Sequence, residues 1–197
     1  GALAQVRSEA KRLARGLPDR PALSLGQMAA LAYPDRVALR RSGDAPRYLL
    51  SGGKGAVLDA GDALAAQRLL VVTDTDGDPR EAKVRQATVI SEADLRAIHG
   101  DAIAWHDVCA WSRREGRVET RRQERFGALA LDDRRWSDAP PEAVAQAMLD
   151  GVRQLGLRPS AAAQRFRARV ALVPGLPDMS DDALLSTLEI WLLPHLA

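Results

Sequence analysis

The feature that most constrains this chain is a series of five short strand-like segments between residues 34 and 90. In most of them apolar and polar residues alternate, and Gly, Asp or Pro residues lie between one segment and the next. The segments are Arg36–Arg41, Arg47–Ser51, Gly55–Leu58, Arg68–Thr73 and Ala82–Ile90. Several short strands joined by such turns are typical of a small antiparallel β-barrel, so a barrel is expected here.

Helical patterns lie on both sides of this region. Apolar residues recur every three or four positions in residues 1–16, and a second short helix is expected at 24–33, with a break in "GLPDRP" between them. After residue 90 we expect a short helix, then a strand, a turn at Glu115–Gly116 and a long strand. Helices follow, one at Pro141–Leu155 with Val144, Met148, Val152 and Leu155 on its apolar face, and a last one that begins after Ser180. The predicted fold class is therefore α+β, with N-terminal helices, a barrel, and a mixed β-hairpin and helical C-terminal part.

Composition excludes several classes of protein. Hydrophobic residues make up 46% of the chain and charged residues 27%, which is typical of a folded globular protein rather than a disordered one. No apolar run approaches the roughly 18–20 residues that cross a bilayer, so no membrane partner is expected. Cys109 is the only cysteine, which rules out an internal disulfide and favours a reducing, cytoplasmic location.

The stretch "LLSGGKGAVL" (49–58) is the best candidate for a phosphate-binding loop, and it fails the comparison with a nucleotide-binding P-loop. Tyr48 occupies the position of the first required glycine, and Gly55 occupies that of the magnesium-binding hydroxyl. The loop also joins two strand patterns, whereas a P-loop leads into a helix. A hairpin-like turn is therefore expected, with Lys54 free to contact a nucleic-acid backbone.

The other catalytic and metal motifs are equally incomplete. The acidic stretch "DTDGDPREAKVR" resembles a calcium loop, but Pro79 occupies the glycine position and Arg85 that of the bidentate glutamate. His106 and Cys109 have the spacing of metal ligands, yet a closed zinc site needs four ligands, and three His and one Cys are all that the whole chain offers. A partly buried Cys109 without a metal is therefore the expectation. The residues predict neither a catalytic site nor a metal site.

Basic residues give the strongest binding signal. The first 47 residues hold nine Arg or Lys against four Asp or Glu, and "SRREGRVETRRQERF" (112–126) is an arginine-rich ribbon. Arginine suits phosphate contacts, and aromatic rings can stack on bases. The candidates are Arg40, Arg41, Arg47, Tyr48, Lys54, Arg113, Arg114, Arg117, Arg121, Arg122 and Arg125. The alternative for the ribbon is a solvated hairpin with cross-strand ion pairs, and for Trp105 and Trp111 it is core packing.

Several stretches together resemble a known family. They are "LGQMAALAYPDRVALRR", "RYLLSGGKGAVL", "LLVVTDTDG", "EAKVRQATVIS", "REGRVETRRQERFGALAL" and "LSTLEIWLLPHL", in this order along nearly the whole chain. They resemble the region after the motor in HrpB-type bacterial ATP-dependent helicases, which are relatives of the DEAH-box RNA helicases. The link between residues 157 and 178 is shorter than the family pattern.

The resemblance implies a domain organisation and a role. Residues 1–33 would be the end of an auxiliary helical region, 34–90 an OB-like barrel, and 91–197 a truncated, family-specific C-terminal α+β region. ATP and magnesium would bind in a motor that precedes Gly1, so the parent chain would be an enzyme and this fragment would carry no catalytic site. Its expected role is to hold single-stranded RNA or DNA beside the parent's motor domains. The alternative is a protein-interaction or regulatory module, which the small net charge of +2 favours.

Overall fold

The chain forms two compact units in the computed structural model, which describes residues 1–16 and 22–196. The barrel unit comprises Gly1–Leu50 and Lys54–Ile98, and the sheet unit comprises Ser51–Gly53 and His99–Ala197. The centre of the break expected in "GLPDRP" lies outside the described residues. The chain is a mixed α+β protein, as predicted.

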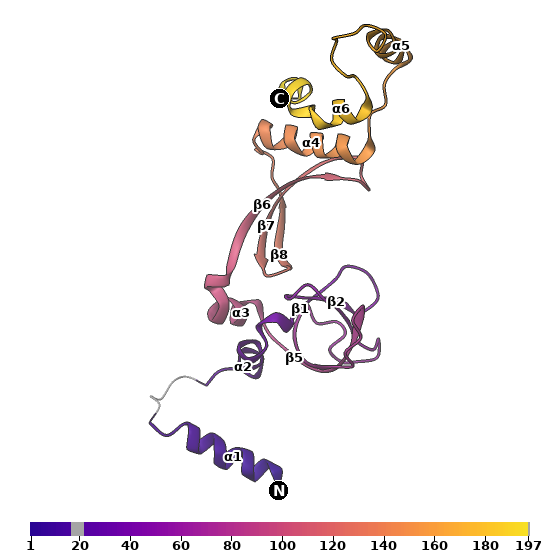
Figure 1. The fold of residues 1–197 in the computed structure, drawn as a ribbon. Coiled ribbons are helices and arrows are strands. Elements are labelled where there is room, and N and C mark those ends of the chain that lie inside the picture. Colours follow the sequence, from indigo (N-terminus) through magenta and orange to yellow (C-terminus); the bar gives the residue numbers. More distant parts are fainter. Residues whose placement is uncertain (17–21, 197) are drawn as a thin grey trace. The chain divides into compact units, whose positions relative to one another are not determined.

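A closed barrel of five strands forms the centre of the barrel unit (Figure 1). All five strand-like segments of the sequence form strands, and their order around the barrel is β1-β2-β3-β5-β4. The bounds are β1 Val37–Arg40, β2 Arg47–Leu50, β3 Gly55–Val57, β4 Leu69–Thr75 and β5 Glu81–Val89. Alternation made these strands predictable, because every second side chain of β2, and of β5 from Glu81 to Arg85, turns into the barrel.

One pairing corrects the expectation of an antiparallel barrel. β3 and β5 run parallel, with Gly55 opposite Glu81 and Val57 opposite Lys83, while the other neighbouring pairs are antiparallel. A ring of strands can alternate in direction all the way round only if the number of strands is even. Five strands therefore require at least one parallel pair.

Tyr48 lies in the core of the barrel, together with apolar side chains such as Leu70 and Val72. Its hydroxyl oxygen lies 3.0, 3.2 and 2.9 Å from the carbonyl oxygens of Leu64, Ala65 and Gln67. These carbonyls belong to the connection between β3 and β4. The tyrosine thus ties that connection to the barrel interior.

Three α-helices belong mainly to the barrel unit: α1 Ala2–Leu13, α2 Leu25–Ala32 and α3 Glu92–His99, with the 3₁₀ turns η1 Pro34–Arg36 and η2 Gly100–Ala102 following α2 and α3 along the chain. Ser24 and Gln27 form a capping box at the start of α2. Ser91 caps the start of α3, because the Asp94 backbone N–H donates to Ser91 Oγ at 3.0 Å. None of the residues of α1 is buried.

Three antiparallel strands form the centre of the sheet unit, in the order β6-β7-β8. Their bounds are β6 Ile103–Ser112, β7 Arg117–Phe126 and β8 Leu129–Arg135. The sequence predicted one long strand after the turn at Glu115–Gly116, and that prediction is wrong. Gly127 ends β7 with φ of 55°, a left-handed conformation that reverses the chain and creates a third strand.

Helix α4, Pro141–Leu155, covers one face of this sheet (Figure 1). The Cys109 thiol donates to the Ala143 carbonyl at 3.3 Å, and Gly151 lies directly against the Trp111 ring. The buried residues of α4 are Ala145, Ala147, Leu149 and Gly151. On the predicted apolar face three residues are only half-buried and Leu155 is exposed. Small residues predominate on the buried face because they let the helix approach the sheet closely.

The remaining helices follow α4 in the sheet unit: α5 Ala161–Val170, α6 Asp181–Ser186, α7 Leu188–Trp191 and the 3₁₀ turn η3 Leu193–His195. Ser180 caps α6, as predicted, but the expected single last helix is interrupted at Thr187. No helix within the described part of the chain is both long enough and apolar enough to span a membrane.

Candidate nucleic-acid interface

The outer surface of β2, β3 and β5 gathers basic side chains around a glycine. Tyr48, Ala56 and Ala82 point into the barrel, so the residues directly before and after each of them on its strand point outward. We call this surface the barrel outer face, and its residues on the three strands are Arg47, Leu49, Gly55, Val57, Glu81 and Lys83. Two predicted candidates, Arg47 and the neighbouring Lys54, therefore lie on or beside one surface.

Most of the cations at the barrel outer face have no acidic partner. Arg47 Nε lies 3.3 Å from Glu81 Oε1. Arg41 extends over the same surface, since its guanidinium is 3.9 Å from where a Cβ on Gly55 would lie. Arg41, Lys54 and Lys83 form no ion pair with any described residue. No sequence motif indicates Lys83, and the pairing of β3 with β5 brings it to this surface.

Two predicted contact residues serve the fold instead. Arg40 is half-buried, and its guanidinium donates to the carbonyls of Ala65 at 2.9 Å and Asp44 at 3.4 Å. Tyr48 is 1% exposed, and burial raises the pKa of its hydroxyl. The prediction that Tyr48 contacts nucleic acid is therefore wrong, because its ring faces the barrel core rather than solvent.

The glycine-rich loop between β2 and β3 forms the turn that the sequence predicts. It joins two strands, and its Ser51 carbonyl accepts a hydrogen bond from the Ala128 backbone N–H at 2.9 Å. Gly127 meets the same residue closely, since a Cβ there would lie 2.5 Å from Ser51 O. With no helix N-terminus beside it, this loop does not fit the phosphates of a nucleotide.

Strand alternation divides the arginine-rich ribbon between the two faces of the sheet. We call the face of the sheet that α4 covers the α4 face, and Cys109 lies on it because its thiol contacts α4. Arg122 lies on the same face, because its partner Asp107 is two positions from Cys109 along β6. Arg117, Arg121 and Arg125 lie on the opposite side, which we call the open face. Arg113 and Arg114 lie in the β6–β7 turn, where Arg113 donates to the Gln154 carbonyl at 3.2 Å and Arg114 is 94% exposed.

On the α4 face the arginines are already paired. Arg122 donates to both oxygens of Asp107, at 2.6 and 3.1 Å, and lowers the pKa of that carboxyl. Its guanidinium also lies 5.6 Å from the Trp136 ring centroid. Arg134 pairs with Asp132 and lies 5.0 Å from the Trp105 ring centroid. The cross-strand ion pair that the sequence offered as an alternative is confirmed for Arg122.

The two tryptophans of β6 differ in their surroundings. Trp111 is half-buried against Gly151 of α4, as core packing predicts, and its indole N–H finds no acceptor. Trp105 is 44% exposed, so core packing is wrong for it. The exposure of the two rings differs because α4 lies over Trp111 and does not extend over Trp105.

On the open face some arginines have partners and others do not. Arg121 donates to one carboxylate oxygen of Asp133 at 2.8 Å, and the Gln123 side-chain amide donates to the other oxygen at 3.0 Å. The Gln123 side-chain oxygen accepts a hydrogen bond from Arg125 Nε at 3.0 Å. Arg117 and Arg135 have no side-chain partner among the described residues. Arg135 is not among the predicted candidates, because the strand β8 that carries it was not expected.

These residues surround a shallow hollow of about 330 Å³. It is lined by Arg117, Val118, Glu119, Thr120, Arg121 and Arg135. Three arginines therefore line one depression, with Glu119 as the acidic lining residue. Such a lining favours an anion.

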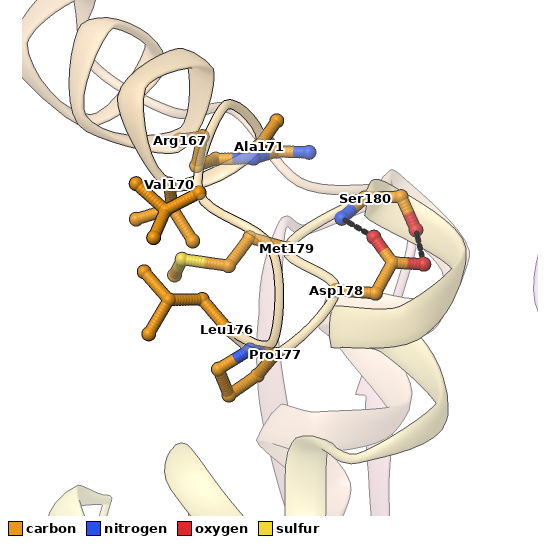
Figure 2. A pocket seen from close by; sticks show the side chains of 9 residues that line it. Arg167, Val170, Ala171, Leu176, Pro177, Asp178, Met179 and Ser180 are labelled. Carbon is orange, nitrogen blue, oxygen red and sulfur yellow. Dashed lines mark hydrogen bonds between the residues drawn. The ribbon is translucent and has the colours of Figure 1, made fainter.

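Two further hollows lie near α5 and α6. Figure 2 shows the first, of about 440 Å³, where Asp178 accepts hydrogen bonds from the backbone N–H and hydroxyl of Ser180 at 2.8 and 2.9 Å. These bonds lower the pKa of Asp178 and belong to the cap of α6. The second, about 800 Å³, is largely apolar and includes Phe166 and Trp191. Within residues 1–16 and 22–196, no group of three His, Cys, Asp or Glu side chains could hold a metal ion.

Comparisons with known proteins show what this chain is similar to. No family model matches the chain. The chain is 29% identical over 184 residues to the ATP-dependent RNA helicase HrpB of Escherichia coli, covering 87% of this chain and 22% of the relative. The crystal structure of the E. coli DExH-box NTPase HrpB aligns with 88% of this chain and 23% of that one, at 29% identity and a TM-score of 0.51. A crystal structure of the E. coli DEAH/RHA helicase HrpB aligns with 84% of this chain and 22% of that one, at 28% identity and a TM-score of 0.45. The chain thus spans about a fifth of the length of the relative it matches, and over nearly all of its own length it is a homologue of the HrpB-type helicases, as its sequence motifs predicted.

Proposed function

We propose that this chain is an accessory nucleic-acid-binding region of a bacterial ATP-dependent RNA helicase. It holds single-stranded nucleic acid, with RNA favoured over DNA, in the cytoplasm while a motor elsewhere in the protein moves along the strand. ATP and magnesium belong to that motor, because the glycine-rich loop of this chain does not fit a nucleotide. The homology to E. coli HrpB supports the helicase parent.

The observation that carries the proposal is the cationic barrel outer face. Arg41 lies beside Gly55, Lys54 precedes it in the chain, and Lys83 is opposite Val57 on the neighbouring strand. None of these three cations has an acidic partner among the described residues, and Glu81 pairs with Arg47. The strand order supports an OB-like barrel, in which the surface over the second and third strands binds oligonucleotides. Here that surface is the barrel outer face.

The chemistry of this surface suits a nucleic-acid backbone. Unpaired cations neutralise phosphates and release counterions, which supplies affinity that does not depend on base sequence. Gly55 has no side chain, so a strand can approach the sheet closely there. The half-buried Leu49 and Val57 offer apolar contact to sugars or bases.

The test is a titration of the full 197-residue chain with fluorescein-labelled single-stranded RNA at several salt concentrations. Each phosphate contact contributes roughly 0.7 to the slope of log affinity against log salt for a single strand. The double variant Arg41→Ala/Lys54→Ala should therefore lose about 1.4 from that slope. The control is Arg169→Ala, an exposed cation on α5 that should bind RNA like the unmodified chain. An unchanged slope in the double variant would remove the barrel outer face from the proposal.

A protein-interaction role is the second candidate, and the apolar hollow beside α5 favours it. Phe166 is 57% exposed and Trp191 37% exposed, which is unusual for large apolar side chains in a monomeric domain. The same titration separates the candidates, because a purely protein-binding module would not bind RNA even at low salt.

A further inference from the structure

We infer that Arg117, Arg121 and Arg135 form a phosphate-binding subsite on the open face of the three-stranded sheet. The inference rests on the proposed function, because the phosphate is that of the bound strand's backbone. It assigns the contact to one face of β7 and excludes the other. It also includes Arg135, which no sequence motif indicated.

The first argument is the geometry of the hollow. The three guanidinium-bearing residues line one depression of about 330 Å³, although they come from two different strands. On β6 the same face carries small side chains, including the exposed Ala104 and Ala110. His106 and Val108 lie between these alanines on the same face, with Val108 directly opposite Arg121. A strand lying beside the arginines would therefore meet one aliphatic side chain and one imidazole on β6.

The second argument is charge. Arg121 and Arg135 are directly opposite each other on β7 and β8, and like charges at such positions repel. Asp133 neutralises Arg121, but Arg117 and Arg135 have no side-chain partner among the described residues, and Glu119 is the acidic residue lining the hollow. Two unpaired guanidinium groups beside a hollow favour a bound anion, and their planar forks suit phosphate oxygens.

The third argument is the contrast with the α4 face of the same strands. There the cations Arg122 and Arg134 are paired with Asp107 and Asp132, and Glu124 lies opposite Asp132. That patch holds more carboxylates than guanidinium groups. It would repel a phosphate, even though its positions are adjacent in sequence to those of the subsite.

Arginines on opposite faces of the same two strands provide a matched pair of double variants. Arg117→Ala/Arg135→Ala and Arg122→Ala/Arg134→Ala remove the same charge from the same two strands. In the RNA titration, the first variant should lose about 1.4 from the salt slope and roughly tenfold in affinity at 0.1 M salt. The second should bind nearly as the unmodified chain does. Thermal unfolding of both variants checks that each is folded.

Inorganic polyphosphate, a chain of phosphates without bases, serves as a second probe and should show the same order of variants. Equal losses in both variants, or no loss in Arg117→Ala/Arg135→Ala while the unmodified chain binds RNA, would overturn the subsite and leave the proposed function standing. If polyphosphate binding needs Arg117 and Arg135 but RNA does not bind at all, the phosphate site stands and the proposed function fails. No binding of either probe at low salt overturns both.

Discussion

At the scale of single residues, hydrogen bonding of a buried polar group decides between a structural and a binding role. The Tyr48 hydroxyl lies within 3.2 Å of three carbonyl oxygens in the β3–β4 connection. A hydroxyl donates only one proton at a time, so it alternates among these acceptors or favours one of them. Arg40 also donates to one of these carbonyls, that of Ala65. Tyr48 and Arg40 thus stabilise the barrel together.

Replacing Tyr48 with Phe should destabilise the chain without weakening RNA binding. The ring still fills the core, while the lost hydrogen bond lowers the free energy of unfolding by about 1 kcal/mol. Urea denaturation measures the loss. The control is Tyr33→Phe, because Tyr33 is 37% exposed and should change stability little. A variant of normal stability with weaker RNA binding would show that Tyr48 contacts the nucleic acid after all.

At the scale of elements, the packing of α4 on the sheet depends on a glycine in the helix interior. Glycine usually weakens a helix by about 1 kcal/mol relative to alanine. At Gly151, however, a Cβ would lie 2.4 Å from Trp111 Cδ2, closer than any real contact. Close approach of the helix to the sheet therefore outweighs helix propensity at this position.

Gly151→Ala should therefore lower the free energy of unfolding, although replacing a helical glycine with alanine usually raises it. The added methyl group must displace the indole or the helix, and overpacking of this kind costs roughly 1–3 kcal/mol. Thermal or urea unfolding should show the loss. Gln146→Ala, at an exposed position of the same helix, should be neutral or slightly stabilising. A more stable Gly151→Ala variant would mean that α4 does not lie against Trp111.

The elements also show which parts of the fold sequence patterns can predict. The barrel strands were predictable because alternation along β2 or β5 is the geometry of a strand with one buried face. The parallel pairing of β3 with β5 was not, since pairing depends on residues far apart in sequence. The turn at Gly127 was not predictable, because a single glycine within a strand pattern does not by itself indicate a chain reversal. The buried face of α4 was not predictable either, because alanine and glycine contribute little to an apolar pattern.

At the scale of the whole molecule, the net charge of +2 hides a sharp division among the basic side chains. Arg122 and Arg134 are paired with carboxylates, whereas Arg41, Lys54 and Arg117 have no acidic partner among the described residues. The candidate site was therefore predictable as a set of basic positions. Which of them are available depends on strand register, and the sequence alone does not determine that register.

If one RNA strand contacts both cationic surfaces, the effects of removing them should add. The barrel outer face and the open-face subsite share no residue, and effects at independent sites are usually additive. Combining Arg41→Ala/Lys54→Ala with Arg117→Ala/Arg135→Ala should lower the salt slope by about 2.8 in all. The measurement is the same RNA titration, with an oligonucleotide long enough to reach both surfaces. A combined loss no larger than that of one pair would mean that a strand uses only one of the two surfaces.

The order β6-β7-β8 leaves β6 and β8 as the outer strands of a sheet that is not closed, unlike the barrel. Outer strands can pair with the same strand of another molecule and begin aggregation. The outer strand β8 ends in four consecutive charged residues, Asp132 to Arg135, and such residues disfavour that pairing. The same charges that shape the phosphate subsite would therefore also help keep one copy of the chain from joining its sheet to the next.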